Sequence, residues 1–153
     1  MEDVEATETL VTLLAAPGGL TERREAGRRL LQLLYDCPDV ESCRQVIGAL
    51  GQLGERRAVA ALVTRLKNPM VQRASIRALG KIDGPESIAA LIDCLLHDER
   101  SLARIEAARA LRSSGIPWVK YSLWQAVLRD PEPAVRDAAW MTLSDIAASA
   151  RRP

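Results

Sequence analysis

Apolar side chains recur along this chain at the spacing of an amphipathic α-helix. In one segment a single helical side carries Val71, Ala74, Ser75, Ala78, Leu79 and Ile82. A helix turns about 100° per residue, so these positions form one continuous stripe that can be buried. Read along the chain, the pattern predicts an all-α protein with about nine helices, near residues 3–15, 22–35, 40–53, 56–67, 69–82, 85–96, 100–114, 117–129 and 132–149.

The helical pattern is also repeated. The octet VAALVTRL begins at Val59, and the closely similar IAALIDCL begins 29 positions later at Ile88. A second anchor recurs at steps of 29, 32 and 32 residues, ending at Leu50, Leu79, Leu111 and Leu143. A period of this size indicates a stacked array of helical hairpins, because a lone hairpin cannot bury both of its apolar sides. We therefore predict an α-solenoid, a superhelix of antiparallel helix pairs.

Turn residues recur in the same register as the helices. Each predicted hairpin turn has a side chain that can accept from free amides at the next helix start, namely Asn68, Asp98 and Asp130. Two prolines fit first helical turns, where the missing amide hydrogen costs little: Pro85 and Pro117. Gly54 and Gly84 suit helix exits, where a left-handed residue ends a helix.

The length of 153 residues favours one domain over 1–153, with divergent capping repeats over 1–54 and regular repeats over 55–149. Hydrophobic residues make up 48% of the chain, yet Phe is absent and aromatic residues are only 3%. The core must therefore be built from Leu, Ala, Val and Ile. Alanines along the helical seams let neighbouring helices approach closely without large side chains.

The net charge of +1 provides no global field that would attract nucleic acid or an anionic membrane. The acidic opening MEDVEATETL is not a secretory signal, and no stretch of about 18 apolar residues occurs, so we expect a cytoplasmic protein that does not contact a membrane. Three cysteines, Cys37, Cys43 and Cys94, form no CxxC pair. Their odd number argues against a disulfide framework and a zinc site, and we expect free thiols.

The segment NPMVQRASIRALGKIDGPESIAALIDCLLHDE (68–99) resembles the HEAT-like repeat family, especially its short bacterial form related to bilin-lyase repeats. The resemblance covers about 45–149. Positions that match the family pattern include Val71, Ala78, Leu79, Gly80, Leu91, Arg104, Ala107, Asp130, Pro131, Val135, Arg136 and Leu143. Gln72 and Cys43 depart from it, since the family has Arg there. The resemblance implies an α-solenoid, a fold that hosts many activities.

Two arginines of the matching positions, Arg104 and Arg136, admit two interpretations. Their guanidinium groups could bind an anion from outside the protein. The family pattern instead implies a ladder, in which each arginine bonds a turn aspartate of its own or an adjacent unit, here Asp98 and Asp130. We favour the ladder.

The side of each second helix opposite the seam is the candidate binding surface. Stacking is expected to align these sides on one concave face, where we predict partner-binding residues Arg44, Arg73, Ile76, Arg77, Ile105, Arg109, Arg112, Trp140 and Met141. An apolar and locally cationic groove suits an acidic amphipathic protein or peptide. The alternative is that the row Ile47, Ile76 and Trp140 packs between helices and that the arginines are merely solvated.

The last repeat contains most of the aromatic residues. Trp124 aligns with Ile92 of the preceding unit, so we predict that it belongs to the core. Trp118 and Tyr121 align with less buried positions and could form an exposed aromatic patch, where interfaces are enriched in such side chains. A terminal cap or a self-association surface is the equally favoured alternative.

No Walker loop, GxSxG or GxGxxG motif occurs, and His97 with Cys94 supplies too few ligands for zinc. We therefore predict a non-catalytic protein-interaction scaffold without catalytic residues, cofactor or metal. A nucleic-acid-binding protein similar to DNA glycosylases of the HEAT-like class is one alternative, although the near-neutral charge argues against it. A bilin lyase-like or chaperone accessory protein is the other, and it depends on the family resemblance alone.

Overall fold

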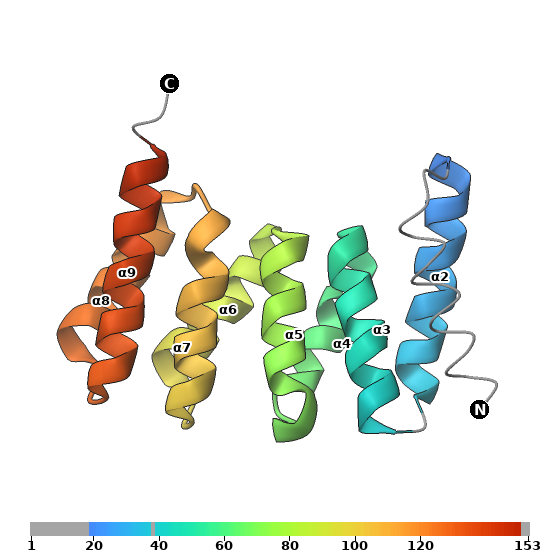
Figure 1. Ribbon diagram of the computed structural model, residues 1–153, viewed down its shortest axis with the longest axis horizontal. Helices are drawn as coiled ribbons and strands as arrows, with labels where there is room; N and C mark the ends of the chain where they lie inside the picture. Colours follow the sequence, from blue (N-terminus) through green and yellow to red (C-terminus); the bar gives the residue numbers. More distant parts are fainter. Residues whose placement is uncertain (1–18, 38, 151–153) are drawn as a thin grey trace. The chain divides into compact units, whose positions relative to one another are not determined.

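The computed structural model describes residues 19–37 and 39–150, and the secondary structure within these residues is helical throughout (Figure 1). They form the eight α-helices α2 (Leu20–Asp36), α3 (Val40–Leu53), α4 (Val59–Arg65), α5 (Pro69–Ile82), α6 (Pro85–His97), α7 (Ser101–Ala110), α8 (Pro117–Arg129) and α9 (Pro133–Ser149). Two short 3-10 helices, η1 (Arg56–Ala58) and η2 (Leu111–Ser113), complete them. The all-α prediction is confirmed, and the helix expected near 3–15 lies outside the described residues.

The chain divides into two compact units, over residues 1–82 and 83–153. In the first unit α3 packs along α5, with α2 beside α3 and α4 beside α5. In the second unit α6 pairs with α7 and α8 pairs with α9, and α7 lies along α9. Each unit is thus a stack of antiparallel helix pairs, which is the all-α solenoid architecture that the repeat predicts. The single-domain organisation stays a prediction.

The predicted boundaries hold for most helices, and the two exceptions have a common cause. The helix expected over 56–67 begins as η1 and continues as the shorter α4, while the one expected over 100–114 ends as η2. The tighter 3-10 geometry is frequent in the first and last turns of helices, where the α-helical hydrogen bonds are incomplete. An apolar periodicity cannot distinguish the two kinds of helix over so few residues.

The hairpin turns are capped as predicted. In each turn a side-chain Oδ1 accepts from the amide two residues later: Asn68 from Met70 at 3.0 Å, Asp98 from Arg100 at 2.9 Å, and Asp130 from Glu132 at 2.9 Å. These bonds satisfy backbone donors that helix geometry leaves free. The first turns of α6 and α8 contain Pro85 and Pro117, also as predicted.

The helix exits confirm one glycine prediction and correct the other. Gly54 ends α3 in the left-handed region with φ 67°. Gly84, in contrast, is extended, with φ −134° and ψ 165°, and Asp83 takes the left-handed conformation with φ 45°. The cause is Pro85, because a proline ring restricts the preceding residue to extended backbone. The chain must therefore reverse one residue earlier, at an aspartate, which tolerates the left-handed region better than most residues.

The core has the composition that the sequence predicts. Its largest fully buried side chains are Leu30, Leu34, Val46, Ile47, Leu50, Leu62, Ile76, Leu79, Leu91, Leu95, Leu111 and Leu123. Helices α3 and α5 approach each other closely at Gly51 of α3, where a Cβ atom would lie 2.8 Å from the Cα atom of Ala78 on α5. Two small residues thus bring the backbones of α3 and α5 nearly into contact.

Cys37 and Cys43 form a disulfide, which corrects the prediction of free thiols. Cys37 directly follows the last residue of α2, Cys43 lies in the first turn of α3, and their Cα atoms are 5.4 Å apart. An odd number of cysteines does not prevent one pair from forming. Disulfides are rare in reducing compartments such as the cytoplasm. The Cys37–Cys43 disulfide therefore argues against the cytoplasmic location, which stays a prediction.

Cys94 is the free cysteine, and its thiol is buried in the second unit. Burial, together with the negative charges of Asp98 and Asp93, raises its pKa to about 12. Because the thiolate is the reactive form, this thiol should be inert near neutral pH.

We expect iodoacetamide to modify no cysteine of the native protein at about pH 8, one after denaturation without reductant, and all three after reduction. Mass spectrometry of the alkylated chain would count the adducts directly. Three adducts in the denatured but unreduced chain would contradict the disulfide, and rapid modification of the native chain would contradict the burial of Cys94.

Candidate functional site

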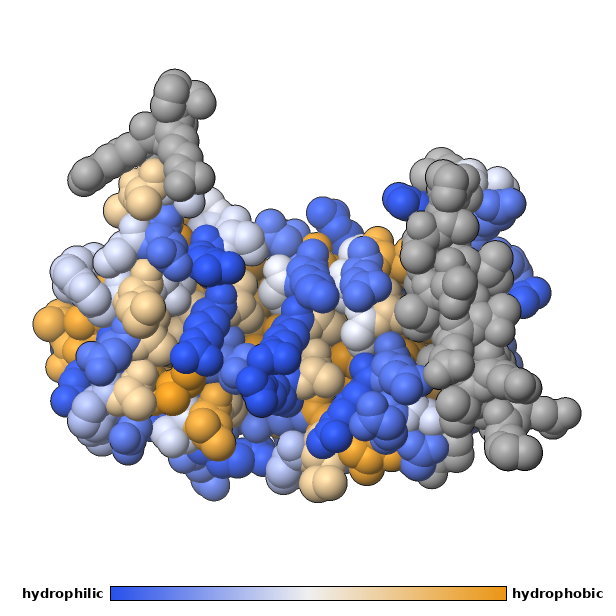
Figure 2. Space-filling model, viewed as in Figure 1, coloured by the Kyte–Doolittle hydropathy of each residue, from blue (hydrophilic) through white to orange (hydrophobic). Residues whose placement is uncertain are grey.

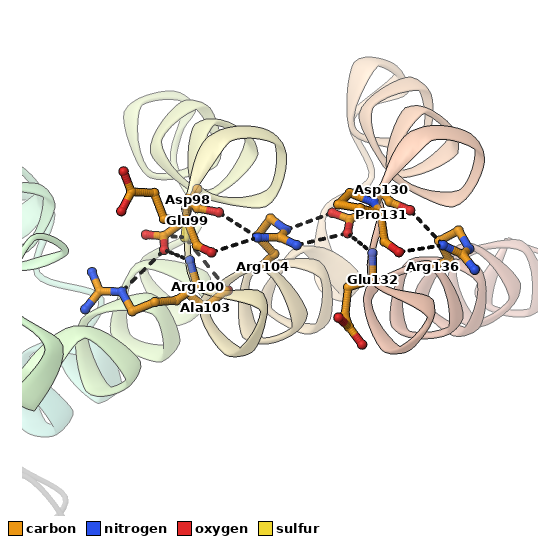
Figure 3. Close-up of polar contacts among 10 residues, drawn as sticks. Asp98, Glu99, Arg100, Ala103, Arg104, Asp130, Pro131, Glu132 and Arg136 are labelled. Carbon is orange, nitrogen blue, oxygen red and sulfur yellow. Dashed lines mark hydrogen bonds and ion pairs between the residues drawn. The ribbon is translucent and has the colours of Figure 1, made fainter.

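Arg104 of α7 holds the centre of a buried polar ladder in the second unit (Figure 3). Its Nε and Nη2 donate to the two carboxylate oxygens of Asp130, at 2.8 and 3.0 Å. Its Nη1 donates to the carbonyl oxygens of Asp98 and Glu99, at 2.8 and 3.3 Å. Only 8% of Arg104 is exposed, so its guanidinium group stabilises the fold and does not face solvent.

The ionisation of the pair fits this geometry. Burial alone would raise the pKa of the Asp130 carboxyl, but hydrogen bonds from Arg104 and from the Glu132 amide, with the charges of Arg104 and Arg136, hold it below its usual value. The hydrogen bond to Asp130 raises the pKa of the Arg104 guanidinium in turn. Both groups are therefore charged near neutral pH, and they form an ion pair.

Arg136 of α9 makes the corresponding contacts to its own turn. Its Nη1 donates to the carbonyl oxygens of Asp130 and Pro131, at 2.8 and 3.1 Å (Figure 3). The ladder prediction is confirmed, since both arginines tie a helix to the preceding turn and Arg104 also reaches the aspartate of the following one. Arg104 is buried and already binds a carboxylate of the protein, which excludes the binding of an anion from outside.

In the first unit, a row of exposed basic side chains runs along α5. Arg73, Arg77 and Lys81 follow one another at four-residue steps, and all three are exposed. The sequence of α5 contains no acidic residue. Lys81 is not among the residues predicted from the sequence, although its position four residues after Arg77, in a helix without acidic residues, indicates that it continues the row.

Arg44 adds a basic side chain from the neighbouring helix α3 to those of α5. Its Nε donates to the carbonyl oxygen of Met70 at 3.0 Å, and its Nη1 lies 3.5 Å from Glu41 on the same helix. The side chain thus bridges α3 and the start of α5 while remaining exposed. Together the four basic residues Arg44, Arg73, Arg77 and Lys81 define what we call the α3–α5 basic surface.

Ile76 does not belong to this surface, which corrects its predicted role in partner binding. The side chain is fully buried, as is Ile47 at the corresponding position of α3. In a stacked array both flanks of a second helix are covered by neighbours, so the exposed arc is narrower than a helical projection suggests. For Ile47 and Ile76 the alternative of packing between helices is the correct one.

The second helices of the second unit have a more balanced charge. Arg109 lies 3.7 Å from Glu106 of α7, and Arg112 lies 3.5 Å from Asp145 of α9. Ile105 is half-buried, while Met141 is exposed. Figure 2 shows bands of hydrophilic side chains over α5 and over α7. The band over α7 is of mixed sign, whereas α5 contributes only cations.

The aromatic residues of α8 are exposed. Trp118 and Tyr121 are exposed, and their part in an aromatic patch stays a prediction. Trp124 is 45% exposed, which corrects its assignment to the core, and its ring lies 5.6 Å from that of Trp140 in an edge-to-face arrangement. Ile92, the residue with which Trp124 aligns, is itself only half-buried, so the alignment did not mark a core position. The larger indole of Trp124 extends to Trp140 on α9.

Within the described part of the chain, no three His, Cys, Asp or Glu side chains are grouped so as to hold a metal ion. No helix of this part is long and apolar enough to cross a membrane.

Two family models match the chain. The model described as HEAT repeats matches residues 27–112, and the one described as HEAT repeat matches residues 121–150. A search of the curated proteins finds no significant match. The matches cover more than half of the chain and include both the α3–α5 basic surface and the Arg104 ladder.

Proposed function

Because the chain belongs to the HEAT repeat family, whose members generally serve as protein-interaction scaffolds, we propose that it is a non-catalytic scaffold for an acidic partner protein. The partner would bind the exposed sides of the second helices. The main support for this proposal is the row of basic residues on α5, which we call the α5 row. Its members Arg73, Arg77 and Lys81 are exposed on a helix that contains no acidic residue. A chain with a net charge of only +1 that concentrates cations on one helix creates a local attraction without general affinity for anions.

The recognition mechanism combines charge with a rigid backbone. Arg44 and the α5 row are carried by helices that the Gly51 contact holds close together, so the cations are spaced before the partner arrives. Pre-organisation of this kind lowers the entropy cost of binding. In the second unit Arg109 and Arg112 can exchange their present acidic neighbours for those of a partner, and Met141 supplies apolar contact.

Charge reversal tests the proposal. We expect the combined variant Arg73→Glu, Arg77→Glu and Arg109→Glu to lose at least about a hundredfold in affinity for the partner, because like charges then face each other. All three side chains are exposed, so the melting temperature should change little. The partner would be isolated with the wild-type chain by cross-linking in the source cell, and its affinity would be measured by calorimetry with purified proteins.

A matched control carries the same charge change on another helix. Arg23, Arg24 and Arg28 of α2 are also exposed, and their replacement by Glu should leave the affinity within about twofold. If both variants lost the same affinity for the partner, the cause would be the change in net charge and not the position of the arginines. Unchanged affinity of the variant at positions 73, 77 and 109 would refute the proposal. A gel shift across salt concentrations separates the nucleic-acid alternative, since phosphate contacts produce a steep salt dependence.

A further inference from the structure

One face of α7, continued into η2, packs against the α8–α9 hairpin inside the second unit. Arg104, Ala108 and Arg112 follow one another at four-residue steps, so they share that face. Arg104 is buried and bonds Asp130 in the turn before α9, and Ala108 is fully buried. Arg112 of η2 is exposed and lies 3.5 Å from Asp145 of α9. The α8–α9 hairpin therefore docks on this face through an aspartate at its turn and the helix that follows.

The equivalent face of α9, 32 residues later, consists of Arg136, Trp140 and Ser144. No helix among the described residues covers it. Trp140 is 52% exposed at the position where Ala108 is fully buried, and Arg136 is half-buried where Arg104 is buried. Ser144 is exposed, as is Arg112 at the equivalent position. The α9 face thus repeats a docking surface whose occupant, within the described chain, is missing.

The hydrogen bonds of Arg136 show what that occupant should supply. Arg104 uses Nη1 for two turn carbonyls and leaves Nε and Nη2 for the carboxylate of Asp130. Arg136 uses Nη1 in the same way, and among the described residues these are its hydrogen bonds (Figure 3). Its Nε–Nη2 edge retains the planar fork that matches a carboxylate.

Helices α8 and α9 also expose large apolar side chains. The rings of Trp140 and Trp124 are already in contact, with centroids 5.6 Å apart, and Leu128, one turn after Trp124 on α8, is 74% exposed. Two indoles that restrain each other lose less conformational freedom on binding than free side chains would. Trp and Arg are also the residues that most often dominate binding energy at protein interfaces.

We propose that Arg136, Trp140 and Ser144, with Trp124 and Leu128, form a second docking surface, which we call the α8–α9 face. Its occupant is an α-helical segment of a partner protein, with an Asp or Glu at the turn before the helix and apolar side chains on the first turns. Asp130 sets the pattern, because its carboxylate caps the start of α9 through the Glu132 amide while it binds Arg104. The surface is distinct from the α3–α5 basic surface and does not depend on the function proposed there.

The test uses the full chain and two synthetic helical peptides. Each peptide has about 20 residues, enough to be helical alone, with leucines at i, i+3, i+4 and i+7 and no tryptophan. One begins with Asp-Pro and its twin with Asn-Pro. Binding is followed by anisotropy of the labelled peptide, and by a blue shift of the protein's tryptophan emission.

We expect the Asp peptide to bind at least about tenfold more tightly than its Asn twin, since a charge-assisted pair is at stake. Arg136→Gln should abolish this preference while leaving the weaker binding of the Asn twin. Trp140→Ala should weaken both peptides about thirtyfold, as expected of an interface tryptophan. Ser144→Glu, an exposed substitution at the end of the face, should weaken the binding of both peptides by placing a charge beside their leucines.

The controls are Arg24→Gln and Tyr35→Ala, which remove an exposed arginine and an exposed aromatic ring from α2. Both should bind like the wild type. Equal affinity for the two peptides, absence of saturable binding, or wild-type binding by Arg136→Gln and Trp140→Ala would each overturn the proposal. A dimer in sedimentation that Trp140→Ala dissociates would also overturn it, because the occupant would then be a second copy of the chain.

Discussion

Replacing Arg104 with methionine is expected to lower the free energy of unfolding by about 3–5 kcal/mol, the range found when one partner of a buried ion pair is removed. Methionine keeps the apolar length of the side chain, so the loss isolates the guanidinium. The carboxylate of Asp130 would lose the bidentate partner that offsets its burial, and the carbonyls of Asp98 and Glu99 would lose their donor. Chemical denaturation of wild type and variant measures the difference.

Arg136→Met is the matched control, because it removes the same group at the equivalent position of α9. Arg136 is more exposed and donates only to two carbonyls, so its loss should cost about 1 kcal/mol. If both variants lost equal stability, the bidentate bond to Asp130 would not be the source of the effect. This stability measurement does not test the proposed binding of a partner carboxylate by Arg136, which takes place on the exposed α8–α9 face.

Acid provides a second measurement of the same pair. The pKa of Asp130 is lower in the folded protein than its usual value, so the unfolded chain binds the proton more readily. The carboxylate therefore contributes stability above the unfolded pKa, and this contribution disappears as the pH falls through the folded pKa. The difference in unfolding free energy between wild type and Arg104→Met should shrink below about pH 4. A difference independent of pH would contradict the ion pair.

The sequence predicts the fold well because its signals are local and repeated. Each hairpin turn has a side chain that accepts from an amide two residues later, at Asn68, Asp98 and Asp130. The first turns of α6 and α8 contain Pro85 and Pro117. Each of these requires only that a residue fit the backbone of its immediate neighbours. The left-handed exit at Asp83 could also have been predicted, since the restriction that Pro85 imposes on Gly84 is local.

The candidate site was harder to predict because exposure depends on neighbours that a helical projection does not contain. Ile76 and Trp140 occupy the same phase of their helices, yet one is fully buried and the other is half exposed. Likewise, the charge of Arg112 is balanced by Asp145, a residue 33 positions away. The disulfide between Cys37 and Cys43 depends on the distance between the end of α2 and the start of α3, which composition and cysteine number do not reveal.

Gly51→Val should lower the free energy of unfolding by about 3 kcal/mol, at the upper end of the range for overpacking. The new Cβ alone would lie 2.8 Å from the Cα atom of Ala78, which is backbone and cannot rotate away. The gain in helix propensity over glycine is too small to offset this clash. The same substitution at Gly48 of α3, where nothing lies within 4 Å of the added Cβ, should be neutral or slightly stabilising.

The clash also carries a functional consequence, because relief requires α3 and α5 to move apart. That movement would break the hydrogen bond from Arg44 to the Met70 carbonyl and shift Arg44 away from the α5 row. At temperatures where Gly51→Val is still folded, it should therefore bind the acidic partner more weakly than Gly48→Val does. Calorimetric affinities of the two variants would show this, and equal affinities would mean that the spacing of α3 and α5 does not govern recognition.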